Sequence, residues 1–188
     1  MMPTVRPPPP KELWGRLAEY GTATISSALR EECGVTRAYA FGPACVVPGQ
    51  RLVGLAKTIS FLPKREDIIQ GLAEEENEKE SPLWCAPPPP PANPLAAAAH
   101  PPARGRRSGV METGEDEVLV VDCRGNMQTG CLGGMLMTAL ATNGAAGLVV
   151  DGCVRDLPEA IGLADELPVF VRGGTPHNAG HYEMYPVK

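Results

Sequence analysis

The order of apolar segments between residues 117 and 171 is the feature that most restricts how this chain can fold. Residues 117–122 (EVLVVD) and 147–151 (GLVVD) are continuous apolar runs, typical of strands buried on both faces. A helical pattern over 133–143 separates them, another helix is expected near Asp156, and 169–171 is a third apolar run. Alternating strands and helices predict parallel pairing through right-handed crossovers, so this half of the chain is expected to be α/β.

Two short helices are predicted in the first 34 residues. Apolar side chains recur at helical spacing in 13–17 and again in 25–29. Thr22 or Thr24 is the expected N-cap of the second helix, and Gly34 is its expected end.

Two further elements carry local signals. Residues 53–61 alternate as a half-buried strand does, with Lys57 as the one break. The helix near Asp156 has a spacing to Glu159 that resembles a capping box, and Pro158 suits its first turn.

Proline marks the segments that we do not expect in the core. Of 21 prolines, five lie in residues 3–10 and nine in 82–102. Residues 64–113 begin with an acidic stretch and continue as Pro- and Ala-rich sequence, which cannot bury enough apolar area to offset its ordering entropy. We therefore expect a Pro-rich tail over 1–10 and one domain over 11–188, interrupted by a flexible insertion at 64–113.

Composition excludes several classes of protein. No apolar run approaches the roughly 20 residues that span a bilayer, and no apolar signal core follows the start, so we expect no membrane contact. A net charge of −5 and 5% aromatic residues argue against nucleic-acid binding. The six cysteines form no C-x-x-C pair, which disfavours a zinc site or a disulfide framework and favours the cytoplasm.

The first candidate site is the Gly-rich stretch 122–134 (DCRGNMQTGCLGG). Gly133 and Gly134 would let backbone amides approach an anion at a helix N-terminus, where a carboxylate or phosphate fits. The alternative is that these glycines only permit tight packing of helix on sheet. No nucleotide-binding glycine pattern is present.

The second candidate site is the end of the next strand. Arg155 offers a fork of donors for a carboxylate or enolate oxygen, and Asp156 offers oxygen ligands to a cation such as Mg²⁺. The alternative is that Asp156 caps the following helix and Arg155 makes a surface ion pair. Both strands end at one sheet edge, which favours a common site.

These residues also resemble a known family. Residues 133–160 (GGMLMTALATNGAAGLVVDGCVRDLPEA) closely resemble the signature region of the RraA-like family, which includes 4-hydroxy-4-methyl-2-oxoglutarate aldolases and oxaloacetate decarboxylases. Residues 22–29, 48–61 and 167–176 support the resemblance, which covers about two thirds of the chain. It implies a swivelling β/β/α fold, assembled as homotrimers or hexamers with sites between subunits.

The resemblance also assigns roles to residues. Arg155 would contact the substrate carboxylate or 2-oxo oxygen, and Asp156 would ligate a divalent metal, Mg²⁺ first and Mn²⁺ second. The substrate carboxylate would lie on the backbone amides of Gly133, Gly134, Met135 and Leu136. The implied activity is that of a class II, metal-dependent pyruvate aldolase that cleaves 4-hydroxy-2-oxo acids or decarboxylates oxaloacetate.

The lysines fit a metal route. None of them lies in either candidate loop, which disfavours a Schiff base; they are Lys11, Lys57, Lys64, Lys79 and Lys188.

Three features depart from the family pattern. Family members continue past the segment matching 174–176, so the end at Lys188 predicts an incomplete C-terminus; Ser27 stands where many relatives have Asp; and the insertion replaces a short connection. Two other functions therefore stay open: a non-catalytic RraA-like regulator, and an inactive truncated family member.

Overall fold

The computed structural model describes residues 10–63, 106–177 and 184–187. No helix in these ranges is long and apolar enough to cross a membrane. The elements are α1 (Glu12–Glu19), α2 (Thr22–Cys33), β1 (Ala44–Cys45), β2 (Leu55–Pro63), α5 (Arg106–Met111), β3 (Glu117–Gly130), α6 (Gly134–Thr142), β4 (Gly147–Val154), α7 (Leu157–Gly162), β5 (Val169–Gly174) and β6 (Met184–Val187).

The strands form one six-stranded sheet in the order β1-β5-β4-β3-β2-β6. Neighbouring strands from β2 to β5 pair in parallel, whereas β1 and β6 pair antiparallel at the two edges. The predicted α/β class and its parallel pairing are therefore confirmed. The carboxyl ends of β3, β4 and β5 meet at one sheet edge, as the crossover rule requires.

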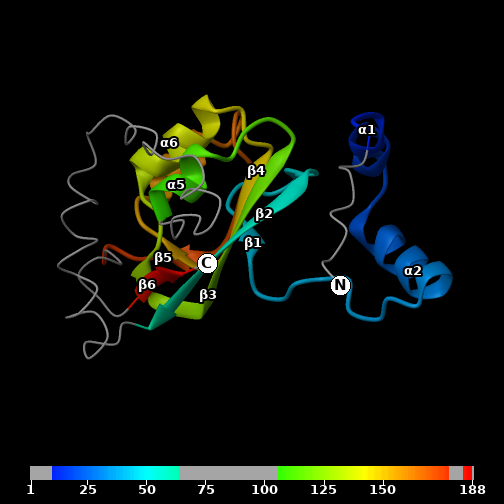
Figure 1. Ribbon diagram of the computed structural model, residues 1–188, viewed down its shortest axis with the longest axis horizontal. Helices are drawn as coiled ribbons and strands as arrows, with labels where there is room; N and C mark the ends of the chain where they lie inside the picture. Colours follow the sequence, from blue (N-terminus) through cyan, green and yellow to red (C-terminus); the bar gives the residue numbers. More distant parts are fainter. Residues whose placement is uncertain (1–9, 64–105, 178–183, 188) are drawn as a thin grey trace, which may run out of the picture.

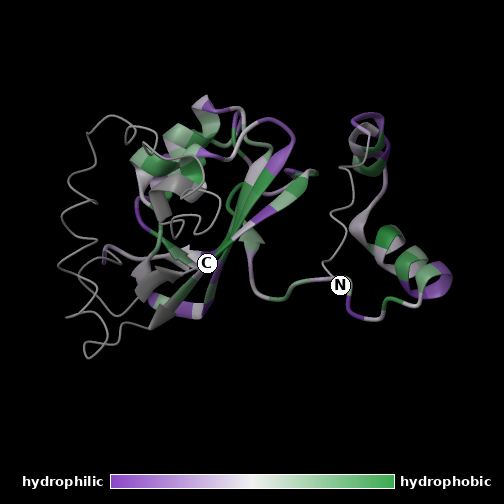
Figure 2. Ribbon diagram, in the orientation of Figure 1, coloured by the Kyte–Doolittle hydropathy of each residue, from purple (hydrophilic) through white to green (hydrophobic). Residues whose placement is uncertain are grey.

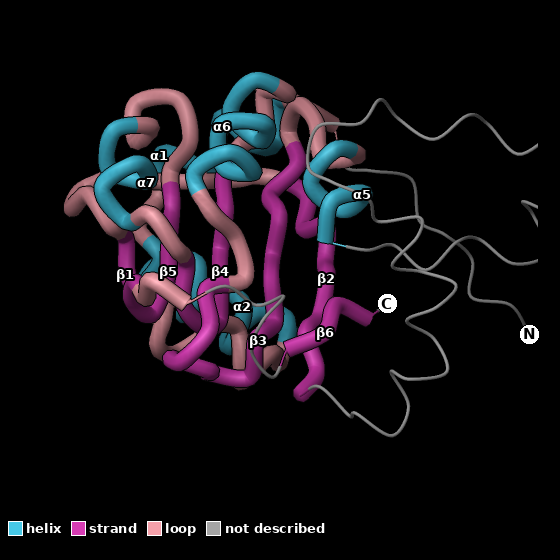
Figure 3. The backbone as a smooth tube through the Cα atoms, turned by 90° about the vertical axis from the view of Figure 1, so that its left-hand side faces the viewer, coloured by secondary structure: helices cyan, strands magenta, loops and turns pink. Residues whose placement is uncertain are grey.

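The core lies between the sheet and the helices α5, α6 and α7, which cover the same face (Figures 1 and 3). Central apolar residues of β3 and β4 pack there against α6, whose apolar character stands out in Figure 2. Leu119, Leu148 and Leu140 are fully buried. Because these side chains are closely packed, they hold α6 in place against the sheet, together with the loops that follow β3 and β4.

Helices α1 and α2 lie on the other side of the sheet from α6 (Figure 1). Both predicted helices are confirmed, and α2 ends at Gly34, whose left-handed φ of 68° closes the helix. The predicted N-cap is wrong, because α2 begins at Thr22 with Gly21 as N-cap and no side-chain cap. Neither helix contains a buried residue.

Strand β3 continues beyond the predicted strand, through most of what we expected to be a loop. Residues 122–130 of β3 stand opposite only 151–153 of β4, with register shifts at two points. The extra residues bulge because Asp122 accepts a hydrogen bond from the Arg124 amide and Asn126 accepts from the Gln128 amide. The loop itself is therefore short, residues 131–133.

Part of the predicted insertion belongs to the packed structure. Within the segment 64–113, α5 forms over Arg106–Met111, and both Val110 and Thr113 are buried. Residues 64–105 lie outside the described residues. The boundary at 113 is therefore too late, because the Pro- and Ala-rich composition does not extend into α5.

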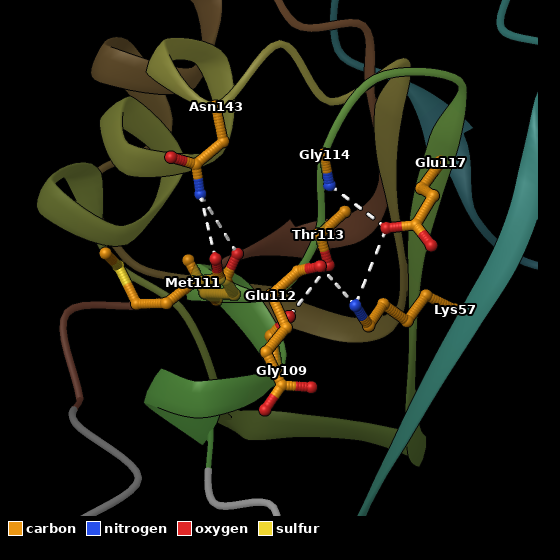
Figure 4. A network of polar contacts seen from close by, with 9 residues as sticks. Lys57, Gly109, Met111, Glu112, Thr113, Gly114, Glu117 and Asn143 are labelled. Atoms are coloured by element: carbon orange, nitrogen blue, oxygen red, sulfur yellow. Dashed lines mark hydrogen bonds and ion pairs between the residues drawn. The ribbon is translucent and has the colours of Figure 1, made fainter. Parts of the chain in front are cut away.

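Lys57 interrupts the alternation of apolar and polar residues in β2, and its side chain contacts the end of α5 (Figure 4). Its ammonium group donates to the Glu112 carbonyl and lies 3.5 Å from a carboxylate oxygen of Glu117. The Glu117 carboxylate also accepts from the Gly114 amide at 3.0 Å. This network satisfies a helix C-terminus and joins β2, β3 and the turn after α5.

Candidate functional site

The loop between β3 and α6 places a helix N-terminus at the sheet edge. Leu132 is fully buried and anchors the loop, and α6 begins at Gly134 with Gly133 as its N-cap. The amides of Leu136 and Met137 donate to the Gly133 carbonyl at 3.0 and 3.1 Å. Gly133 has no side chain to cap the helix, so a cap must come from elsewhere.

The loop between β4 and α7 supplies that cap. The Gly134 amide donates to Oδ2 of Asp156 at 2.9 Å, and the Arg155 amide donates to the Leu132 carbonyl at 2.7 Å. The two candidate loops, far apart in sequence, therefore touch through both backbone and side chain. A carboxylate at the positive end of α6 is also electrostatically favourable.

Asp156 caps α6, whereas the alternative from the sequence was a cap on the following helix, α7. It stands at the N-cap position of α7 but makes no side-chain cap hydrogen bond there. Its left-handed backbone, with φ 53° and ψ 50°, accompanies a side chain directed to α6. The capping alternative is thus wrong for α7, and the carboxylate remains largely exposed beside the loop.

Arg155 lies half-buried between β3 and the segment after β5. Its Nε atom is buried and has no hydrogen-bond partner among the described residues. An alanine at 130 would place its Cβ 2.5 Å from Cγ and 2.8 Å from the amide nitrogen of Arg155, so only glycine leaves room for it. The surface ion-pair alternative is wrong, because Arg155 forms no ion pair within the described residues and its half-buried stem lies against Gly130.

The backbone amides expected to hold a substrate carboxylate are partly engaged. Gly134 donates to Asp156, and Leu136 donates to Gly133. Met135 directs an exposed side chain outward, with 51% of its surface accessible. A Cβ at Gly133 would stand 2.9 Å from Oδ2 of Asp156, so this glycine is needed for the contact between the loops.

Asp156 is the residue of this loop that would ligate a divalent metal. The described residues contain no group of three or more His, Cys, Asp or Glu that could hold a metal ion. Asp156 offers an exposed carboxylate whose Oδ2 is held by Gly134. Mg²⁺ commonly binds one or two carboxylates and keeps waters and substrate oxygens as its other ligands, so the donor set suits Mg²⁺ better than a protein-enclosed metal.

Sequence reasoning missed the third segment at this edge, residues 174–177, which we call the strap. The Gly130 amide donates to the His177 carbonyl at 2.8 Å, and the Thr175 amide donates to the Val154 carbonyl at 3.0 Å. The signal for it was present, because 169–171 was predicted as a strand parallel to 147–151 and its carboxyl end must reach the same edge.

The carboxylate at the end of the predicted strand 117–122 has a local role. The Asp122 carboxylate accepts a hydrogen bond from the Arg124 amide at 2.8 Å and so caps a turn. Two of the chain's three histidines, His100 and His181, lie outside the described residues.

The family model and the named relatives point to one family. The RraA-like family model (Aldolase/RraA) matches residues 22–185. A protein of Albidiferax ferrireducens provisionally named a 4-hydroxy-4-methyl-2-oxoglutarate aldolase is 55% identical over 49 residues, which are 25% of this chain and 28% of that protein. A similarly named protein of Arabidopsis thaliana is 43% identical over 56 residues, 30% of this chain and 34% of its own.

Solved structures extend the likeness over 95% or more of the chain. RraAS2 of Streptomyces coelicolor, described as an unusual member of the RNase ES inhibitor RraA protein family, is 31% identical, with a TM-score of 0.68, over 95% of this chain and 72% of that chain. An uncharacterized protein from Pseudomonas syringae, 20% identical with a TM-score of 0.66 over 98% of this chain and 66% of its own, shares the fold.

The matched segments of the two named relatives cover about a third of their length or less. The family model, in contrast, spans most of the chain, and the RraA-type fold predicted from the signature region is confirmed. The chain belongs to the RraA-like family.

Proposed function

We propose that this chain is a divalent-metal-dependent lyase that forms pyruvate from 2-oxo acids. The substrates would be 4-hydroxy-2-oxo acids, cleaved by a retro-aldol reaction, and oxaloacetate, which would be decarboxylated. The observation that carries the proposal is the buried Nε of Arg155, which has no hydrogen-bond partner in the described part of the chain. The Arg155 backbone is itself bonded to the loop before α6. A buried donor without an acceptor is unfavourable by about 1–3 kcal/mol, and a bound anionic oxygen would remove that penalty.

The chemistry needs positive charge at one atom. In either reaction the bond between C3 and C4 breaks and its electron pair stays on C3, delocalised onto the C2 oxygen as an enolate. The C4 fragment leaves as a carbonyl compound after its hydroxyl loses a proton, or as CO₂ from oxaloacetate. A proton then adds to C3 and gives pyruvate. The Arg155 guanidinium is permanently charged and would stabilise the enolate oxygen as it forms.

Asp156 would hold the metal. Its Oδ2 is oriented by the Gly134 amide, which fixes the carboxylate at the loop and leaves the second oxygen for a cation. When bound, Mg²⁺ would act as a Lewis acid at the 2-oxo acid and stabilise negative charge on its oxygens. A Cβ at Gly133 would lie 2.9 Å from Oδ2 of Asp156 and 3.8 Å from Cβ of Arg155, so the two residues flank the same glycine and would hold a cation and an anion near each other.

A pyruvate-release assay tests the proposal. The full chain is incubated with oxaloacetate or with 4-hydroxy-4-methyl-2-oxoglutarate, with Mg²⁺ and then with chelator, and pyruvate is measured. Because Mg²⁺ alone decarboxylates oxaloacetate, heat-denatured protein with Mg²⁺ is the background. We expect release above this background that chelator removes. Release no faster than the background for both substrates would refute the lyase activity of this chain.

A second candidate function is supported by the likeness to RraAS2. That structure is described within a family of RNase ES inhibitors and is 31% identical over 95% of this chain. A non-catalytic regulator would slow RNA cleavage by an RNase E-type ribonuclease without releasing pyruvate. Inhibition that persists in Arg155→Met would favour regulation through another surface, and a chain with neither activity would be the inactive family member.

The chain would assemble as a homotrimer or hexamer. The absence of buried residues in α1 and α2 supports this proposal, since their apolar side chains have little cover within one subunit. Light scattering after gel filtration measures the mass of the particle. A particle of 19.9 kDa, the mass of one chain, would contradict it.

A further inference from the structure

We propose that the strap, residues 174–177, positions the Arg155 side chain, and that Thr175 is the positioning residue that fixes the strap. This inference rests on the proposed function for its catalytic consequence, but the placement itself can be measured without substrate.

The strap crosses the ends of two strands. It leaves β5, and the Thr175 amide donates to the Val154 carbonyl of β4 at 3.0 Å. Farther along, the His177 carbonyl accepts from the Gly130 amide of β3 at 2.8 Å. The first hydrogen bond is made by Val154, the residue before Arg155, and the second by Gly130, which lies beside the Arg155 stem. The strap is therefore attached on both sides of the arginine.

Gly130 is the point where the strap and the arginine meet. The position that a Cβ at 130 would occupy is 2.5 Å from Cγ of Arg155 and 3.1 Å from the His177 carbonyl oxygen. The arginine stem and the strap backbone therefore share the space above this glycine. Nε of Arg155 is buried and has no hydrogen-bond partner among the described residues. We infer that the strap contributes to this burial, because it reaches the same glycine as the arginine stem.

The Thr175 hydroxyl gives the strap its fixed geometry. It donates to the Gln128 carbonyl at 3.2 Å and accepts from the His177 amide at 3.4 Å. The hydroxyl thus connects the strap to the bulged part of β3 and connects Thr175 to His177 within the strap. Pro176, between Thr175 and His177, restricts the backbone. Loss of the hydroxyl removes both contacts, and the Thr175 amide keeps its hydrogen bond to the Val154 carbonyl as a backbone contact.

The test measures exchange of the Arg155 Nε–H proton with water by NMR, with the resonance assigned by its loss in Arg155→Lys. In Thr175→Val we expect exchange faster by roughly 5- to 10-fold, the factor that one neutral hydrogen bond supplies. Thr175→Ser keeps the hydroxyl and should restore the wild-type rate. Thr142→Val is the matched control, because the Thr142 hydroxyl also donates to a backbone carbonyl, that of Thr138, on the exposed surface of α6.

The catalytic consequence is measured separately. Thr175→Val should lower kcat for pyruvate release by the same factor with little change in KM, while Thr175→Ser and Thr142→Val retain wild-type values. If wild type releases no pyruvate, the lyase proposal fails and the exchange rates alone decide this one. Wild-type exchange in Thr175→Val would overturn the positioning role. Should that variant not fold, an unprotected Gly130 amide in wild type would overturn it.

Discussion

Replacement of Asp156 by Asn and by Ala separates its two roles. The Asn side chain keeps an oxygen that accepts the Gly134 amide, and Asn tolerates the left-handed backbone at φ 53°. Ala loses the cap, at about 1 kcal/mol, and is strained in this conformation by about 1–2 kcal/mol. Asn loses only the interaction of a charge with the α6 dipole, about 0.3–1 kcal/mol.

The expected loss for Asp156→Ala is therefore about 2–3 kcal/mol, and at about 2–4 °C per kcal/mol for a chain of this size the midpoint falls by about 4–12 °C. For Asp156→Asn the same conversion gives about 1–4 °C. Thermal unfolding followed by circular dichroism checks both, with the exposed Asp165→Ala as control. Both variants should lose Mg²⁺-dependent pyruvate release. Equal stability of the Ala and Asn variants would refute the role of Asp156 as the cap of α6.

Two more predictions concern the fold around the site. Lys57→Met keeps the aliphatic stem but removes the ammonium group from its two oxygen partners. Urea unfolding should show a free energy of unfolding lower by about 1.5–3 kcal/mol. Lys11→Met, at an exposed ion pair, is the control and should leave the urea midpoint nearly unchanged. Burial, with a smaller contribution from Cys123, raises the pKa of the Cys153 thiol above its ordinary value of 9.0. Because the folded chain holds this proton more tightly than the unfolded chain, the stability from the neutral thiol is present below pH 9.0 and is lost as the pH rises through the raised pKa. Above pH 9 the unfolding midpoint of wild type should therefore fall more steeply than that of Cys153→Ala. Parallel curves for the two proteins would contradict the raised pKa of Cys153.

The parts of the fold that local pattern predicts are the parallel strands and the helices between them. The apolar runs at 117–122 and 147–151 stand in the centre of the sheet, and 133–143 is α6 to within a residue at each end. Periodicity finds such elements because each buries one face or both against the same core.

Edge strands and the bulge depend on distant partners. β1 is two residues long and exists through its pairing with β5, and β6 exists through its pairing with β2. The second half of β3 is a strand only because β4 lies beside it, although its glycines and Asx turns are signals of a loop. No local pattern contains these pairings.

The candidate site was predictable as a place but not as a set of contacts. Two strand ends at one edge brought Arg155 and Asp156 to the α6 N-terminus, as the topology implied. That Asp156 would cap α6 instead of its own helix, and that Arg155 would bury an unpartnered nitrogen, depend on side-chain directions set by tertiary packing.

The most direct test of the site is the rate of Mg²⁺-dependent pyruvate release from oxaloacetate by Arg155→Met compared with wild type. Met can occupy the space beside Gly130 that the arginine stem occupies and leaves no buried donor, so the variant should be at least as stable as wild type. The account predicts a fall of about 10²- to 10³-fold in kcat/KM, the effect of losing an oxyanion donor. A folded Arg155→Met chain that releases pyruvate at the wild-type rate would contradict it.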